Sequence, residues 1–185
     1  MRMTGALPAE TLSELIDAGF IRNGTKANLR PSSLDLTLSS EIYRVEGVFL
    51  PRPYERIRDM LHIIGATKHH FDYPLEKNVT YIVKLEENLH LPEGLYGYCN
   101  PRSSTGRNDI LVRVLADGIG RFDAITESGY AGEMWLVISP QSYPVLMQAG
   151  QTLSQLRLFT GNNPFTELEL QIALERDKLL WDLAS

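Results

Sequence analysis

Residues 100–107, with the sequence NPRSSTGR, carry the side chains best suited to bind an anion. Arg102 and Arg107 lie five positions apart and flank Ser103, Ser104 and a glycine. A guanidinium pairs with phosphate through two hydrogen bonds, and serine hydroxyls add further donors. The motif therefore predicts a polyphosphate site, although it lacks the lysine and the spacing of a P-loop. Taken in isolation, it would be explained better as a polar turn whose arginines form surface ion pairs.

Four other motifs accompany this arginine motif (residues 102–107) along the chain. They are PSSLDLTL at 31–38, LHLPEGL at 89–95, ESGYAGE at 127–133 and GQTLSQL at 150–156. Each is weak alone, but in this order they resemble the dCTP deaminase and dUTPase superfamily over about residues 8–160. The PRSSTGR wording and a helical insertion near 54–65 are most similar to the N-terminal half of the double-length dCTP deaminases. Those proteins carry two copies of the fold, and this chain has room for one.

The resemblance implies zinc-independent hydrolysis of the exocyclic amine of dCTP, which yields dUTP. Water attacks C4 of the cytosine ring, a ring nitrogen is protonated and ammonia leaves, so the site needs a base, an acid and protection from solvent. In the family, a glutamate on the strand after a Gly-aromatic-x-Gly hairpin carries the proton. By the resemblance, Arg102, Ser103 and Ser104 bind the nucleotide and its phosphates, and Ser103 and Arg107 position the reacting water. Tyr130 packs against deoxyribose, and Glu127 contacts the sugar or orients the water. Gln155 holds the hairpin in place.

Three of these assignments have a purely structural alternative. Tyr130 is expected in a hairpin for packing alone, because aromatic residues favour strands. Glu127 would also suit a solvated turn, although its spacing from Tyr130 fits the motif. Gln155 is at least as well explained by a hydrogen bond at a strand edge.

The sequence departs from the family pattern at Val137. Counted from Tyr130, this is the position of the proton-carrying glutamate, and valine cannot transfer a proton. Glu133 would share a strand face with Val137 but lie roughly 13 Å away, too far to replace the missing group. General acid–base catalysis contributes about 10²–10⁴-fold, so its loss would cut turnover and spare binding. Three explanations stay open: another carboxylate such as Glu127 or Asp117 acts, the domain is a non-catalytic copy, or the chain is altered or partial.

Two other functions therefore stay open as alternatives to deamination. One is a dUTPase-like pyrophosphatase or a bifunctional enzyme, in which Glu127 would activate water and Val137 would be no handicap. The other is a non-catalytic nucleotide-binding or assembly domain. Residues 160–185 lack the tyrosine, lysine and glutamine pattern with which single-copy deaminases close the site, beyond Lys178.

Composition limits the class of ligand and cofactor. The net charge of −5 argues against nonspecific binding of nucleic acid, so an anionic ligand needs a local positive site such as Arg102, Arg107 and Arg113. Cys99 is the only cysteine, and a zinc deaminase needs a Pro-Cys-x-x-Cys motif, which excludes that class of metal site. No protein metal ligands are predicted; Mg²⁺ would instead bind through the nucleotide triphosphate.

Location and assembly follow from simple signals and from the resemblance. No segment approaches the ~18–20 apolar residues that span a bilayer, and the N-terminus has no basic-then-apolar signal pattern. We therefore expect a cytoplasmic protein without a membrane partner. The resemblance implies a homo-oligomer, usually a trimer, with sites between subunits and dCTP or a related pyrimidine deoxynucleotide as the ligand.

The elements that must position these residues are mostly short strands. The resemblance and the strand pattern together predict a mainly β, distorted β-barrel or jelly-roll-like fold of the dUTPase type. Apolar periodicity predicts an N-terminal helix at 8–18 and helical character at 54–64, and Thr166 with Glu169 forms a capping-box pattern that favours a helix over 166–183, with a late strand as the rival. We expect a domain over 1–160 and an extension over 161–185. The predicted strands are 34–45, 80–85, 94–98, 110–115, 133–139, 143–147 and 155–159.

Overall fold

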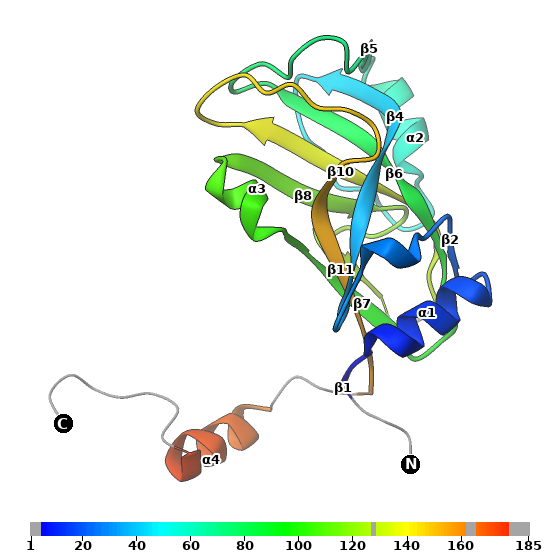
Figure 1. Ribbon diagram of the computed structural model, residues 1–185, viewed down its shortest axis with the longest axis vertical. Helices are drawn as coiled ribbons and strands as arrows, with labels where there is room; N and C mark the ends of the chain where they lie inside the picture. The colour runs from blue at the N-terminus through cyan, green and yellow to red at the C-terminus, as the bar shows by residue number, and fades with distance from the viewer. Residues whose placement is uncertain (1–4, 127–128, 162–165, 178–185) are drawn as a thin grey trace, which may run out of the picture.

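The protein is a distorted antiparallel β-barrel with short helices, described here from a computed structural model (Figure 1). The structure describes residues 5–126, 129–161 and 166–177. The helices are α1 (Ala9–Asp17), α2 (Ile57–Ile63), α3 (Ser103–Arg107) and α4 (Glu167–Asp177), with a 3₁₀ turn η1 (Lys26–Asn28). The strands are β1 (Gly5–Ala6), β2 (Ile21–Arg22), β3 (Leu29–Arg30), β4 (Ser33–Val45), β5 (Thr67–His69), β6 (Thr80–His90), β7 (Leu95–Pro101), β8 (Ile110–Ala116), β9 (Ala124–Ile125), β10 (Ala131–Pro140) and β11 (Thr152–Thr160).

The principal strands follow the order β8-β10-β6-β4-β11-β7-β9. Asp123 makes hydrogen bonds to strands at both ends of this order. Its main-chain N–H donates to Val114 O of β8 at 2.8 Å, and its Oδ1 accepts from Val114 N at 2.6 Å. Its carbonyl accepts from Cys99 N of β7 at 2.9 Å. Asp123 adopts a positive φ of 58°, which aspartate tolerates better than most residues. One acidic residue thus bridges the seam of the barrel.

Two apolar clusters hold the barrel together. The larger cluster fills its interior, where alternate residues of each strand point inward; Leu34, Leu36 and Leu38 of β4 are fully buried there. The helix α1 closes this core with Leu12, as its amphipathic pattern predicted. The smaller cluster lies outside the barrel, where Ile57 and Leu61 of α2 cover the outer faces of the sheet.

The predicted fold class is confirmed, and so are most of the predicted elements. The strand predicted at 80–85 is longer and reaches His90: inward and outward side chains continue to alternate, but Glu87 occupies an inward position and interrupts the apolar pattern. Helix α2 begins later than expected, at Ile57, because a turn with Tyr54 at φ 72° precedes it. The strand predicted at 143–147 is wrong: only an isolated bridge joins Val145 to Leu75. Pro144 has no N–H to donate to a ladder, which explains the failure.

The described part of the C-terminal segment forms the helix α4 rather than the alternative strand, and the predicted continuation over 178–183 lies outside the described residues. Thr166 caps it as predicted: its Oγ1 accepts from Glu169 N at 3.3 Å, and Thr166 N donates to Glu169 Oε2 at 2.8 Å. The division into domains at residue 160 stays a prediction. Across the described residues, no helix has both the length and the apolarity needed to cross a bilayer.

Candidate functional site

A groove of about 940 Å³ lies on the outer face of β6 and β10. Its floor is formed by polar residues of β6, whose outward side chains are Lys84, Glu86, Asn88 and His90. The hairpin residues 129–133 and the segment 117–119 after β8 form one wall. The segment 54–59, which contains the first turn of α2, forms the other. Three stretches far apart in sequence therefore meet at the predicted hairpin motif.

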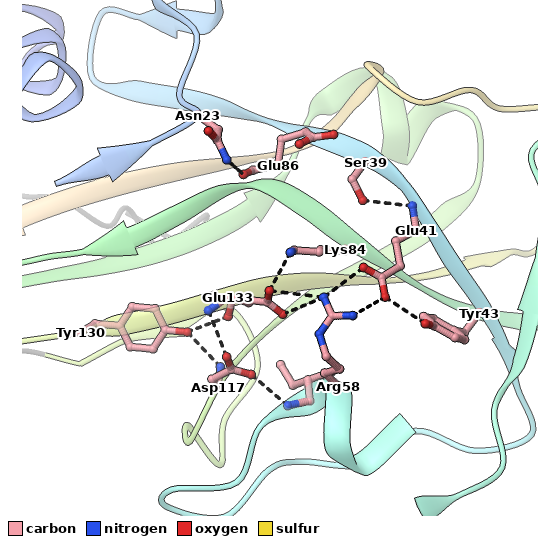
Figure 2. Close-up of polar contacts among 11 residues, drawn as sticks. Asn23, Ser39, Glu41, Tyr43, Arg58, Lys84, Glu86, Asp117, Tyr130 and Glu133 are labelled. Atoms are coloured by element: carbon pink, nitrogen blue, oxygen red, sulfur yellow. Dashed lines mark hydrogen bonds and ion pairs between the residues drawn. The ribbon is translucent and has the colours of Figure 1, made fainter. Parts of the chain in front are cut away.

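Asp117 ties these walls together. Its Oδ1 accepts a hydrogen bond from Ile57 N at 2.9 Å, at the first residue of α2. Its Oδ2 accepts from Glu133 N at 3.0 Å, at the base of the hairpin (Figure 2). Burial raises the pKa of Asp117, and these two hydrogen bonds offset only part of the rise. A carboxyl whose pKa is raised by burial in a groove is a candidate for accepting and releasing a proton during a reaction.

The position of Tyr130 explains why the hairpin motif contains a tyrosine and a glycine. The phenol accepts from Asp117 N at 2.9 Å and donates to Glu133 O at 2.7 Å, so both functions of the hydroxyl are used. The side chain is 5% exposed and packs in the interior cluster. Gly132 is required beside it, because a Cβ there would lie 2.8 Å from the Tyr130 hydroxyl oxygen. In this chain, therefore, the Tyr130 ring presents little surface to a sugar.

A network of charges crosses the groove at Arg58 (Figure 2). Its guanidinium donates to both carboxylate oxygens of Glu41, at 2.6 and 3.0 Å, and approaches Glu133 at 3.3 Å. Lys84 Nζ lies 2.6 Å from Glu133 Oε1. Burial alone would raise the pKa of Glu133, but the hydrogen bond and charge of Lys84, together with Arg58, outweigh it and lower the pKa. The pKa of Glu133 is therefore shifted in the opposite direction to that of Asp117.

Val137, at the position of the expected glutamate, lies outside this groove. It is 4% exposed and packs in the smaller apolar cluster with Trp135, Leu115 and Ile82 under α2. Glu133, Trp135 and Val137 share the outer side of β10, as the strand pattern predicted, whereas Leu136 points into the barrel. Val137 therefore serves the packing of α2 on the sheet.

The arginine motif forms the end of β7 and the helix α3. Arg102 is largely committed to the chain: its Nη1 donates to Thr152 O at 3.2 Å and also to the Thr152 hydroxyl, and its Nε lies 3.6 Å from Asp35 Oδ2. By contrast, the side chains of Ser103, Ser104 and Arg107 have no hydrogen-bond partner within the described chain, and Ser103 and Arg107 are exposed. These three residues are therefore free to contact a ligand.

The structure separates this motif from the groove. Arg107 precedes β8 and Asp117 follows it, so the seven residues of β8 hold them roughly 20 Å apart. Gln155 lies on β11, where it accepts from Ser33 Oγ at 3.2 Å, and does not line the groove. Arg113 pairs with Asp123 at 2.6 Å. Of the predicted site residues, only Tyr130 lies in the groove, and Glu127 falls outside the described residues.

Several groove residues escaped prediction as a site. Lys84 and Asn88 lie on the outer row of β6, but three consecutive polar residues, Glu86 to Asn88, interrupt the alternation after Leu85. Arg58 gave no signal, because its partners Glu41 and Glu133 are distant in sequence.

Comparison with known proteins gives the family. The family model that describes the 2′-deoxycytidine 5′-triphosphate deaminase N-terminal domain matches residues 3–162 of this chain. The chain belongs to the dCTP deaminase family. No curated protein sequence matches it significantly.

One solved structure supports the fold of this deaminase-family chain. The dCTP deaminase of Agrobacterium tumefaciens superposes with a TM-score of 0.84 at 34% identity. The match covers 98% of this chain and 54% of that one, so this chain spans about half the length of that relative. The dUTPase of EIAV gives a TM-score of only 0.38 at 17% identity, over 67% of this chain and 91% of that one, and carries no argument about function.

Proposed function

We propose that the chain binds dCTP or a related pyrimidine deoxynucleotide and hydrolyses its exocyclic amine without zinc. The observation that carries the proposal is the pair of carboxyls in the groove. The pKa of Asp117 is raised and that of Glu133 is lowered. Environments that push two carboxyls in opposite directions are a means by which active sites separate a proton carrier from a fixed charge.

In this proposal Asp117 replaces the glutamate expected at position 137. Asp117 accepts a proton from the attacking water as the water oxygen bonds to C4 of cytosine. Asp117 passes this proton to the ring nitrogen N3, and then carries the proton of the new C4 hydroxyl to the amino group. The C4–N bond breaks as the C4=O bond forms and ammonia leaves, so dCTP and water give dUTP and ammonia. Glu133 stays ionised and, through Lys84 and Arg58, fixes the charges around the reacting ring.

The phosphates are expected to contact a second copy of the chain. Because β8 separates Arg107 from Asp117, we propose that Ser103, Ser104 and Arg107 serve the groove of a neighbouring subunit in a cytoplasmic homotrimer. The described residues hold no cluster of three or more His, Cys, Asp or Glu side chains arranged for a metal ion. Mg²⁺ would accordingly bind through the phosphate oxygens and neutralise part of their charge.

The first test is the conversion of dCTP to dUTP, with ammonia release, by the purified chain. Asp117→Asn should lower kcat by about 10²–10⁴-fold with little change in the Kd for dCTP, since general acid–base catalysis has that magnitude. The control is Asp59→Asn, because Asp59 also lines the groove but is exposed. Equal turnover by Asp117→Asn and wild type would refute the role of Asp117.

A mixing experiment tests the shared site. Arg107→Ala and Asp117→Asn chains are each expected to be nearly inactive. Mixed under conditions that allow subunit exchange, they should regain part of the activity, because some assembled sites combine an intact Arg107 with an intact Asp117. No recovery after demonstrated exchange would place both residues in one subunit's site.

Nucleotide binding without turnover is the second candidate function, and the burial of Val137 favours it. Its signature would be a thermal shift with dCTP or dTTP and no release of ammonia. Pyrophosphate release from dUTP would instead indicate the dUTPase-like activity.

A further inference from the structure

The turn that leads into α2 holds an aromatic residue in an unfavourable backbone conformation. Glu55 N donates to Arg52 O at 3.0 Å, and Arg52 N donates to Glu55 Oε2 at 2.7 Å. Pro53 and Tyr54 occupy the two central positions, and Tyr54 has φ 72°. The second central position of such a turn normally holds glycine or asparagine, because a bulky side chain is strained there. A tyrosine at this place costs stability.

The packing of the barrel does not explain this cost. The Tyr54 side chain is 100% exposed, and it has no ring or cation contact within the described chain. The turn itself is held firmly: Gly118 N donates to Glu55 O at 2.8 Å, and a Cβ on Gly118 would lie 3.3 Å from Tyr54 N. The chain therefore fixes an exposed aromatic ring at the edge of the groove.

The facing floor of the groove contains polar atoms that lack partners. Asn88 Oδ1 and His90 Nδ1 are buried and accept or donate no hydrogen bond in the described structure. Both side chains belong to the outer row of β6 and line the groove with Tyr54. Buried polar atoms without partners are unfavourable and are commonly satisfied by something bound. An aromatic surface and a polar floor suit a flat, polar-edged ring.

We propose that Tyr54 is the surface on which the nucleobase stacks, with its polar edge toward Asn88 and His90. This inference rests on the proposed function, because it assigns a specificity-determining residue to the same groove. Tyr54 would supply the aromatic contact that Tyr130, buried in the barrel, has little surface to provide. Because every nucleobase has a π-face, the contact selects nucleotides over simple phosphates and does not choose among bases.

The test compares Tyr54→Gly with wild type by titration calorimetry and thermal denaturation. Glycine relieves the strain and removes the ring, so the melting temperature should rise while the Kd for dCTP weakens about tenfold or more. Tyr54→Phe should bind dCTP like wild type. Inorganic tripolyphosphate should bind all three proteins equally, because it has no ring to stack.

Asn78→Gly is the matched control, because Asn78 is also exposed with a positive φ of 60° but does not line the groove. It should leave the Kd for dCTP unchanged. Wild-type affinity for dCTP in Tyr54→Gly, or an equal loss for dCTP and tripolyphosphate, would overturn the assignment of Tyr54 alone. Failure of the wild-type chain to bind dCTP would overturn the proposed function and this inference with it.

Discussion

The outer side of β10 has two unlike ends. At one end Glu133 lies in the groove, held by Lys84 and Arg58 and bordered by Asp117. At the other end Trp135 and Val137 are sealed under α2. Arg58 marks the boundary, since its guanidinium reaches Glu133 and also lies 5.4 Å from the centre of the Trp135 ring.

The difference separates a polar end, suited to a ligand, from an apolar end that serves packing. A glutamate at 137 would replace apolar packing, and the cation directly across the ladder, Arg113 of β8, is already paired with Asp123 at 2.6 Å. The groove, by contrast, holds two carboxyls whose pKa values are shifted in opposite directions. The proposed function therefore uses Asp117 and Glu133 at the groove end of β10, and not position 137.

The strongest test of the apolar end is Val137→Glu. Burying a carboxylate there, where the neighbouring Arg113 is already paired with Asp123, should lower the free energy of unfolding at pH 7 by about 3–5 kcal/mol, without raising dCTP turnover. Urea denaturation measures the loss. Ile63→Glu is the control, because Ile63 belongs to α2 but is 72% exposed, and it should change stability by less than about 0.5 kcal/mol. A rise in turnover of orders of magnitude would show that position 137 still borders a reaction site.

Glu87 is a carboxyl group that the protein already buries among apolar residues. This side chain is fully buried, and its oxygens accept from Thr37 N at 2.9 and 3.2 Å. Burial raises its pKa to about 7, against the partial offset of the hydrogen bonds. The folded protein therefore binds an extra proton between about pH 4.5 and 7, and stability falls as pH rises through that range, by roughly 3 kcal/mol in total.

Glu87→Gln should remove this pH dependence, because the amide oxygen still accepts from Thr37 N and does not titrate. The measurement is the unfolding free energy of both proteins from pH 4.5 to 8, where the difference between them should grow with pH. Parallel curves would mean that Glu87 is not protonated in the folded protein at neutral pH. They would also weaken the expectation that a carboxyl at 137 is costly.

The smallest expected effect is at the polar end. Tyr130→Phe leaves Asp117 N and Glu133 O without their phenol partner, so the free energy of unfolding should fall by about 1–2 kcal/mol. Tyr143→Phe is the control, because Tyr143 is 48% exposed. Thermal denaturation measures both. If Tyr130→Phe also loosens the hairpin, the KM for dCTP should rise more than kcat falls.

Local patterns predicted the elements well where one face is buried. The alternation of Leu34, Leu36 and Leu38 with polar residues specified β4, and Thr166 with Glu169 specified the start of α4. The pattern failed at 143–147, where Pro144 interrupts the backbone ladder.

The site was predicted less well, because it depends on contacts between distant segments. Asp117 was named from sequence only as an alternative carboxylate, and its bonds to Ile57 and Glu133 span 60 and 16 positions. The separation of Arg107 from the hairpin follows from the register of β8 and the closure at Asp123, which no local motif encodes. Tyr54 was missed because strain and exposure are properties of the folded turn.

The most direct measurement is dCTP turnover by Asp117→Asn and Val137→Ala, compared below the melting temperature of each. The groove account predicts that Val137→Ala keeps a kcat within a fewfold of wild type, while Asp117→Asn loses at least about 10²-fold with its dCTP affinity intact. The reverse result, with Asp117→Asn active and Val137→Ala inactive though folded, would contradict it.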